Sequence, residues 1–338
     1  MRRSRRRSRF PLLRRIRHLE RLRAPRRYLA YLACRAALSG LSLLPRPIGR
    51  GAGRACGLLF YILSARHRRI ALDNLRLAFG DGLPRGERAR LARASFAHAG
   101  MIMADAAYFA RSARQPIERV AVYEGKEHLL QAAAGRRGVL VFSGHFGHWE
   151  LVALLQARIG VPFSMVVRPL ENGRLDAYLG RLRRVTGNEL ISKYHAARGV
   201  LKALHAGRAV ALLIDQNVRG DGGLFVDFFG VPASTTPALA TFALKSGAPI
   251  VPVFSSLLAD GRILIRYGPP VHVSRRGVLS DDIRAVTQAC THILEEEIRR
   301  RPECWLWMHN RWRTRPATAP VHRSAERDGA AVEAGSFS

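Results

Sequence analysis

Lysine is scarce in this sequence, and so are acidic residues. The 338-residue chain has four lysines, and its 56 Lys and Arg stand against 25 Asp and Glu, a formal net charge of +31. This balance favours anionic partners: lipid head groups, nucleic acid or an acidic carrier protein. Apolar residues at 48% and charged residues at 24% are ordinary globular values, which excludes a wholly disordered chain and a collagen.

Cysteine is also scarce, and its placement argues against two kinds of stabilising site. The four cysteines are scattered, without a C-x-x-C pair or zinc-ligand spacing: Cys34, Cys56, Cys290 and Cys304. We therefore expect free thiols in a reducing compartment rather than a structural zinc or a disulfide framework. The sequence also lacks a G-x-S-x-G nucleophile elbow, which favours a direct reaction over a covalent serine intermediate.

No apolar run near the N-terminus reaches the about 20 residues that a transmembrane helix needs. Residues 1–27 hold 13 Arg and one acid, and residues 28–44 form an apolar stretch that Arg35 interrupts. We interpret 1–27 as a disordered basic arm and 28–44 as an amphipathic or half-inserted anchor on acidic lipid. A single span with a cytoplasmic arm, a nucleic-acid arm and an arm without a lipid role stay open.

Two textures divide the rest of the chain. Residues 28–115 carry apolar residues mostly at helical spacing and no strand signal. After about Val120, short apolar runs typical of strands alternate with helical patterns. The strand-like runs are 138–143, 163–167, 209–214, 250–256 and 262–267, and the helical patterns are 149–158, 174–186, 196–205, 237–245 and 281–300.

This alternation predicts an α/β fold with a largely parallel sheet flanked by helices. Continuously apolar strands fit a sheet that is covered on both faces. The expected organisation is a helical membrane-associating region over 28–115, an α/β domain over 116–316 and a disordered, polar tail over 317–338.

The most informative segment is S-G-H-F-G-H-W-E, residues 143–150, which follows a predicted strand and opens a predicted helix. Sites in open α/β sheets lie at the carboxyl ends of strands. Glu150 in the first helical turn can accept from one imidazole nitrogen of His145 and leave the other as a base. A surface histidine beside an N-terminal glutamate explains the spacing equally well. His145, His148 and Glu150 together could hold a metal, but such a site needs a further clear ligand and a second shell, for which only Asp215 is a candidate.

Six blocks of this sequence, in order along the chain, match the motifs of one known family. The most specific block is residues 144–151. The others are Arg168 with Asn172, residues 215–216 and 227–233 with Thr235, residues 247–252, residues 301–309 with 311–313, and upstream Asn74, 78–79 and 95–96. Together they resemble the lipid A biosynthesis late acyltransferases, the lauroyl and myristoyl transferases of the lysophospholipid acyltransferase superfamily. The match covers about residues 28–315, and His148 stands where that family usually has Asn.

The resemblance implies a glycerol-phosphate-acyltransferase-like fold and direct acyl transfer, with no cofactor or metal. The donor would be an acyl carrier protein thioester, and the acceptor a hydroxyl of an anionic lipid A precursor. His145 would take the hydroxyl proton, Glu150 would hold the imidazole, and Arg168 would bind a phosphate or stabilise the oxyanion. The expected location is the cytoplasmic face of the inner membrane, with no nucleic acid as partner.

Other candidate residues keep two interpretations each. Asp215 positions a substrate sugar or a basic residue, or it caps a loop. Arg219 contacts an anionic substrate or is a solvated surface residue. Phe228, Phe229 and Gly230 shape the acyl pocket or a tight turn beside it. Acylation of another membrane lipid, such as a lysophospholipid, a glycolipid mannoside or an ornithine lipid, stays open, as does a non-catalytic membrane-binding protein.

Overall fold

The computed structural model describes residues 11–111, 116–135, 137–273, 275 and 277–316. Its first part is helical: α1 (Pro11–Leu43), α2 (Arg46–Leu63), α3 (Ala65–Phe79) and α4 (Arg85–Arg111), with short 3-10 turns at Gly80–Gly82 and Ile117–Arg119. The helices expected between residues 28 and 111 are therefore present.

The basic arm differs from the prediction. α1 begins at Pro11, so disorder is wrong for residues 11–27, while residues 1–10 lie outside the described residues. Arginine and leucine are both good helix formers, so this basic stretch can continue the helix that follows it. In the part of the chain that the structure describes, no helix combines the length and the apolar character needed to cross a bilayer. The expected tail, 317–338, also lies outside the described residues.

A seven-stranded sheet forms the second part, in the order β1-β9-β8-β2-β5-β3-β4. Neighbouring strands are parallel except for the antiparallel pair β8–β9, which confirms a largely parallel sheet. A separate hairpin pairs β6 with β7. The strands are β1 (Ala121–Glu124), β2 (Val139–Ser143), β3 (Phe163–Val167), β4 (Glu189–Ser192), β5 (Ala209–Leu213), β6 (Leu224–Phe228), β7 (Val231–Thr235), β8 (Ile250–Leu257) and β9 (Ile263–Tyr267).

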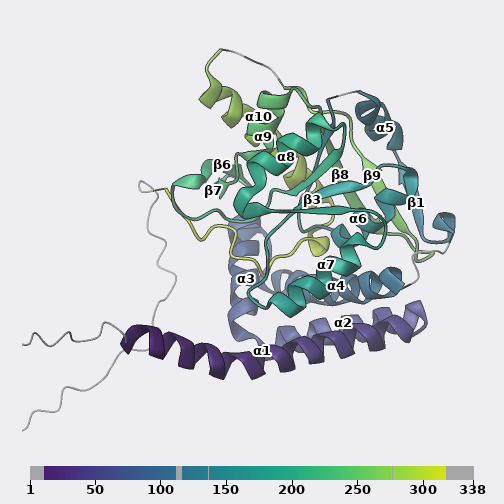
Figure 1. Ribbon diagram of the computed structural model, residues 1–338, viewed down its shortest axis with the longest axis vertical. Coiled ribbons are helices and arrows are strands. Elements are labelled where there is room, and N and C mark those ends of the chain that lie inside the picture. Colours follow the sequence, from purple (N-terminus) through teal and green to yellow (C-terminus); the bar gives the residue numbers. More distant parts are fainter. Residues whose placement is uncertain (1–10, 112–115, 136, 274, 276, 317–338) are drawn as a thin grey trace, which may run out of the picture.

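Helices flank this sheet (Figure 1). One hydrophobic cluster joins the sheet to α3, α4, α8, α9 and α10, and a second joins it to α5 and α6. The strands β2, β3, β5, β8 and β9 thus have the expected cover. The helices of this part are α5 (Lys126–Ala134), α6 (Trp149–Gln156), α7 (Gly173–Arg184), α8 (Ala196–His205), α9 (Ala238–Ser246) and α10 (Leu279–Arg300), with 3-10 turns at Ala157–Ile159, Lys193–His195, Gly220–Gly222 and Pro302–Cys304.

Glycines bring α2 against α4, and α1 lies beside α2 (Figure 1). The buried residues of α2 are Gly49, Gly53 and Gly57. A Cβ on Gly57 would lie 2.1 Å from the carbonyl oxygen of Phe96, which no larger residue can accept without moving α2 away. α4 also contacts α6, the helix that begins directly after the 143–148 segment. The N-terminal helices are therefore joined to the β2–α6 turn through α4.

Candidate active site

The turn between β2 and α6 places His145 at the carboxyl end of a central parallel strand. Two glycines allow this turn. Gly147 has a φ of +56°, and a Cβ there would lie 1.8 Å from the carbonyl oxygen of Ser255. A Cβ on Gly144 would crowd Leu294 at 2.9 Å and a carboxylate oxygen of Asp215 at 3.1 Å. The G-H-F-G pattern is thus required by close packing on both sides of the histidine.

The C-terminal segment holds this turn from outside the sheet. Gly147 donates its backbone N–H to the carbonyl of Cys304 at 3.0 Å, and Leu306 donates to the carbonyl of His145 at 3.1 Å. The segment is in turn held by α3, because the Asn74 amide donates to the carbonyl of Trp307 at 2.8 Å. Three sequence blocks that are far apart in the chain therefore meet at one turn.

Asp215 is the carboxylate that binds the imidazole. Its Oδ1 lies 2.8 Å from Nδ1 of His145, and its Oδ2 accepts the backbone N–H of the same residue at 2.7 Å. Trp305 donates its indole N–H to Oδ2 at 2.8 Å. Asp215 follows β5, the neighbour of β2, and Ser143 pairs with Leu213 at the ends of these strands. Sheet register therefore brings Asp215 to His145.

The electrostatics of this pair suit a general base. Burial would raise the pKa of Asp215, which is 3% exposed, but the charge of His145 and the hydrogen bonds that the carboxylate accepts hold that pKa well below its ordinary range. Burial would lower the pKa of His145, yet the charge of Asp215 and the hydrogen bond to it outweigh burial and raise that pKa. With Asp215 ionised, Nδ1 of the neutral imidazole carries the proton and Nε2 presents its lone pair. The amide nitrogen of Gln216, which is exposed, lies 3.3 Å from Nε2 and can donate to it.

The expected hydrogen bond between Glu150 and the imidazole is wrong. Glu150 accepts two hydrogen bonds from Arg183, from Nη2 at 2.6 Å and from Nε at 3.1 Å. The physical reason is direction: the first turn of α6 presents Glu150 to the last turn of α7, where Arg183 lies. The charge of Glu150 still raises the pKa of His145, while that of Arg183 lowers it. No sequence pattern pointed to Arg183, which is 33 positions from Glu150.

His145 and His148 face different partners. His148 is fully buried, and its Nε2 lies 3.1 Å from Oδ2 of Asp105 on α4. The two imidazoles therefore do not converge on a shared ligand position with Glu150. Among residues 11–111, 116–135, 137–273, 275 and 277–316, no three His, Cys, Asp or Glu side chains are grouped to hold a metal ion.

Comparisons with known proteins identify the family of this chain. A family model described as bacterial lipid A biosynthesis acyltransferase matches residues 16–314. The chain belongs to this family. A lipid A biosynthesis acyltransferase of Haemophilus influenzae is 29% identical over 87% of this chain and 93% of its own. A lipid A biosynthesis lauroyltransferase of Escherichia coli is 29% identical over 82% and 89%, and a phosphatidylinositol mannoside acyltransferase of Mycolicibacterium smegmatis is 25% identical over 63% and 72%. The protein is therefore an acyltransferase.

Both candidate arginines of the acyltransferase lie toward the same edge of the sheet as His145. Arg168 is exposed and comes directly after β3, whose carboxyl end lies beside that of β5. Arg219 is exposed in the loop after β5, and its charge helps lower the pKa of His309, after the effects of burial and of other charges. The contacts of the described residues do not show what either arginine binds.

Phe228, Phe229 and Gly230 form the turn of the β6–β7 hairpin. Phe228 is fully buried and stacks on Trp312, with ring centroids 5.5 Å apart. Phe229 has a positive φ of 60°, as does Gly230 at 74°, and the Phe229 N–H donates to Glu295 at 2.6 Å. The tight-turn interpretation of these residues is confirmed, and the aromatic pair packs among tryptophans of the C-terminal segment.

The C-terminal block contacts both the turn after β2 and the loop after β5. Trp305 and Trp307 are 1% and 0% exposed, so both pack in the interior of the protein. Nε2 of His309 accepts the backbone N–H of Asn217 at 3.0 Å, which anchors the loop that carries Gln216. The block itself was visible in the sequence, but its contact with the catalytic turn required the fold.

Proposed function

We propose that this acyltransferase moves a fatty acyl chain from an acyl carrier protein thioester to a hydroxyl of a lipid A precursor, without a covalent enzyme intermediate. The observation that carries the proposal is the His145–Asp215 pair at the carboxyl end of β2. It offers a base with a raised pKa whose Nε2 carries a lone pair at the exposed side of the ring, which is the requirement for activating a hydroxyl near neutral pH.

The proposed reaction uses Nε2 of His145. Nε2 takes the proton of the acceptor hydroxyl as its oxygen attacks the thioester carbonyl, and Asp215 stabilises the imidazolium that forms. The carbon–sulfur bond then breaks, and the imidazolium returns the proton to the leaving thiolate. Gln216 occupies the hydrogen-bonding position at Nε2, so its exposed side chain moves aside when the acceptor binds.

Charged residues around His145 would bind the anionic parts of the substrates. The Glu150–Arg183 pair is 19% and 26% exposed, so both groups are accessible to a ligand. We assign Arg183 to the oxyanion or a substrate phosphate, with Glu150 as the carboxylate that orients it. Arg168 and Arg219 would contact phosphates at the outer edge. Phe228, Phe229 and Gly230 would support the acyl pocket from behind.

Family membership and charge support the choice of substrates. Two curated relatives covering more than four fifths of this chain are lipid A biosynthesis acyltransferases by name. A net charge of +31 suits an acidic carrier protein and a phosphorylated acceptor. A second candidate acceptor, a glycolipid mannoside, is favoured by the relative named phosphatidylinositol mannoside acyltransferase, which is less similar.

The outer faces of α1 and α2 support a membrane location. Large apolar side chains on these helices are solvent-exposed although their glycine-rich side is buried: Tyr28, Leu29, Leu32, Leu43, Ile48, Leu58, Leu59, Phe60, Ile62 and Leu63. Exposed arginines such as Arg26, Arg27 and Arg54 flank them. Apolar side chains with adjacent cations fit an anionic lipid surface. We infer that these helices lie on the cytoplasmic face of the inner membrane.

Mass spectrometry of lipids from a Gram-negative host that lacks its own late acyltransferases tests the proposal. Expression of this chain should add one acyl mass to lipid A, and His145→Ala should abolish the addition. A new acyl mass on another lipid would keep the chemistry and replace the acceptor. No new acyl species in any lipid, with the folded chain present in the membrane fraction, would contradict the proposal.

A further inference from the structure

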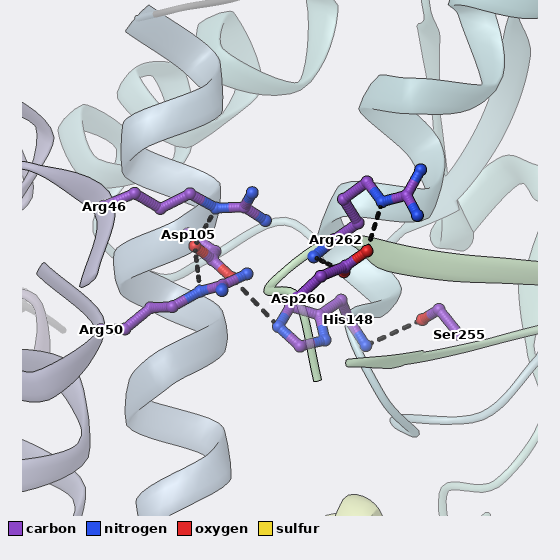
Figure 2. A network of polar contacts seen from close by, with 7 residues as sticks. All are labelled: Arg46, Arg50, Asp105, His148, Ser255, Asp260 and Arg262. Atoms are coloured by element: carbon purple, nitrogen blue, oxygen red, sulfur yellow. Dashed lines mark hydrogen bonds and ion pairs between the residues drawn. The ribbon is translucent and has the colours of Figure 1, made fainter. Parts of the chain in front are cut away.

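A second buried polar cluster joins His148 of the turn after β2 to α2 and α4 (Figure 2). Asp105 of α4 is 1% exposed, and its carboxylate binds two arginines of α2. Nε of Arg46 lies 3.2 Å from Oδ1, and Nη2 of Arg50 lies 2.8 Å from Oδ2. His148 of the turn completes the cluster at 3.1 Å. The exposed Asp260–Arg262 pair in the same figure is a contact within the β8–β9 turn.

The charge state of this cluster follows from its surroundings. Burial would raise the pKa of Asp105, but hydrogen bonds from His148 and Arg50 lower it to about 2. Burial lowers the pKa of His148 and outweighs the attraction of Asp105. Asp105 is therefore ionised and His148 neutral at pH 7, so Nε2 of His148 carries the proton that Asp105 accepts.

The backbone of His148 is also hydrogen-bonded, at both its N–H and its carbonyl. Its N–H donates to the hydroxyl of Ser255 at 2.8 Å, and its carbonyl accepts the N–H of Val152 at 3.0 Å, in the first turn of α6. The ring of His98 packs edge-on against the imidazole, with centroids 5.3 Å apart. Nε2, the backbone N–H and the backbone carbonyl of His148 are thus all hydrogen-bonded, three residues from His145.

We propose that Asp105 is a positioning residue for acyl transfer. Through His148 it fixes the backbone that carries His145, and through Arg46 and Arg50 it fixes the distance between that turn and α2. This inference rests on the proposed role of His145 as base. Relative to apolar packing of the same volume, a buried ion pair adds little net stability, but it fixes the orientation of the groups that it joins. The imidazole of His145, three residues away, depends on that orientation.

Two variants of His148 separate positioning from space-filling. The amide nitrogen of His148→Gln reaches about as far as Nε2 and restores the hydrogen bond to Asp105, whereas His148→Phe fills the ring volume without a donor. We expect kcat of His148→Phe to fall about 10- to 100-fold with KM for both substrates unchanged, and His148→Gln to recover most of it. Equal activity of the two variants, or a loss carried by KM, would overturn the proposal.

Asp105→Asn tests the carboxylate itself, with Glu297→Gln as the matched control. Glu297 is a buried carboxylate of α10, and its ion-pair partners, Arg266 and Arg300, belong to β9 and α10 rather than to the turn that carries His145. Both variants leave arginines with a neutral partner, so both lose stability. We expect only Asp105→Asn to lower kcat by about 10-fold or more in the folded fraction. Equal loss of kcat in both variants would show that stability alone is involved.

An NMR titration of the His145 imidazole in detergent micelles tests the positioning role of Asp105 independently of the identity of the substrates. Asp215 and Glu150 raise the pKa of His145, and Arg183 opposes them. The charge of His145 in turn lowers the pKa of His309, which also faces it. A displaced turn weakens the contact with Asp215, so the pKa of His145 should fall in His148→Phe and not in His148→Gln. This shift is expected even if the acceptor is not lipid A. An unchanged pKa in His148→Phe would refute positioning by Asp105.

Discussion

Replacing Asp215 by asparagine keeps the shape of the side chain and inverts one hydrogen bond. The backbone N–H of His145 and the indole of Trp305 both donate to Oδ2, so the amide oxygen of the introduced asparagine takes that place. The amide NH2 then replaces Oδ1, which lies 2.8 Å from Nδ1 of His145. Two N–H groups cannot face each other, so the imidazole adopts the tautomer with its proton on Nε2 and loses its function as a base.

The expected loss is large. General-base assistance contributes about 10²- to 10⁴-fold, and the wrong tautomer forfeits nearly all of it. We expect kcat to fall about 10³-fold, which corresponds to about 4 kcal/mol of transition-state stabilisation. The pH profile moves as well. Because Asp215 raises the pKa of His145 and only the neutral imidazole accepts a proton, the acidic limb of kcat should move to lower pH in Asp215→Asn.

Single-turnover transfer from a labelled acyl carrier protein to a lipid A precursor measures both effects, with Glu150→Gln in parallel. Glu150 is bound to Arg183, so its variant should affect substrate binding more than the position of the acidic limb. Near-identical thermal unfolding of the variants would show that the fold is intact. The reasoning fails if Asp215→Asn stays within about 10-fold of wild type while Glu150→Gln abolishes transfer and moves the limb.

Three further outcomes follow from the structure. Gly147→Ala should destabilise the fold by about 3 kcal/mol in denaturant unfolding, because its Cβ meets a carbonyl at 1.8 Å, whereas Gly173→Ala, with open space at its Cβ, should be nearly neutral. Leu59→Ser with Ile62→Ser removes two side chains that are 54% and 66% exposed, and should weaken binding to anionic vesicles about 30-fold in a sedimentation assay without changing the unfolding midpoint. The pKa of Asp105 is lowered to about 2 in the folded protein, so the ionised carboxylate contributes about 2 kcal/mol to the free energy of unfolding. This contribution is present above about pH 4 and is lost as the pH falls through about 2. The difference in unfolding free energy between wild type and Asp105→Asn should therefore narrow over that pH range.

Much of the fold was predictable because its central strands are buried on both faces. The runs 139–143 and 250–257 are almost uniformly apolar, and a covered parallel sheet requires that pattern. The edge strands β1 and β4 were missed, since each has four residues and polar termini that resemble loops. The sequence did not predict that α1 continues into the basic arm, because the high charge density of this arm is typical of disorder although arginine and leucine are good helix formers.

The candidate site was also predictable only in part from the sequence. His145 was visible because glycines, a preceding strand and a following helix all lie in one continuous segment. The partner of its imidazole was not, because that depends on which strand lies beside β2. The order β2-β5 brings Asp215 to Nδ1, and no spacing along the chain encodes this order. Glu150 was found, but its direction toward Arg183 depends on where α7 packs.

Two carboxylates raise the pKa of the His145 imidazole, and the fold gives them different partners. Glu150 is paired with Arg183, so the two charges act on His145 in opposite directions. Asp215 accepts from the imidazole of His145, from the backbone N–H of that residue and from the uncharged indole of Trp305, so its negative charge acts directly on the imidazole. The result is a proposed base that Asp215 binds directly, beside an ion pair whose arginine can exchange its partner for an anionic substrate.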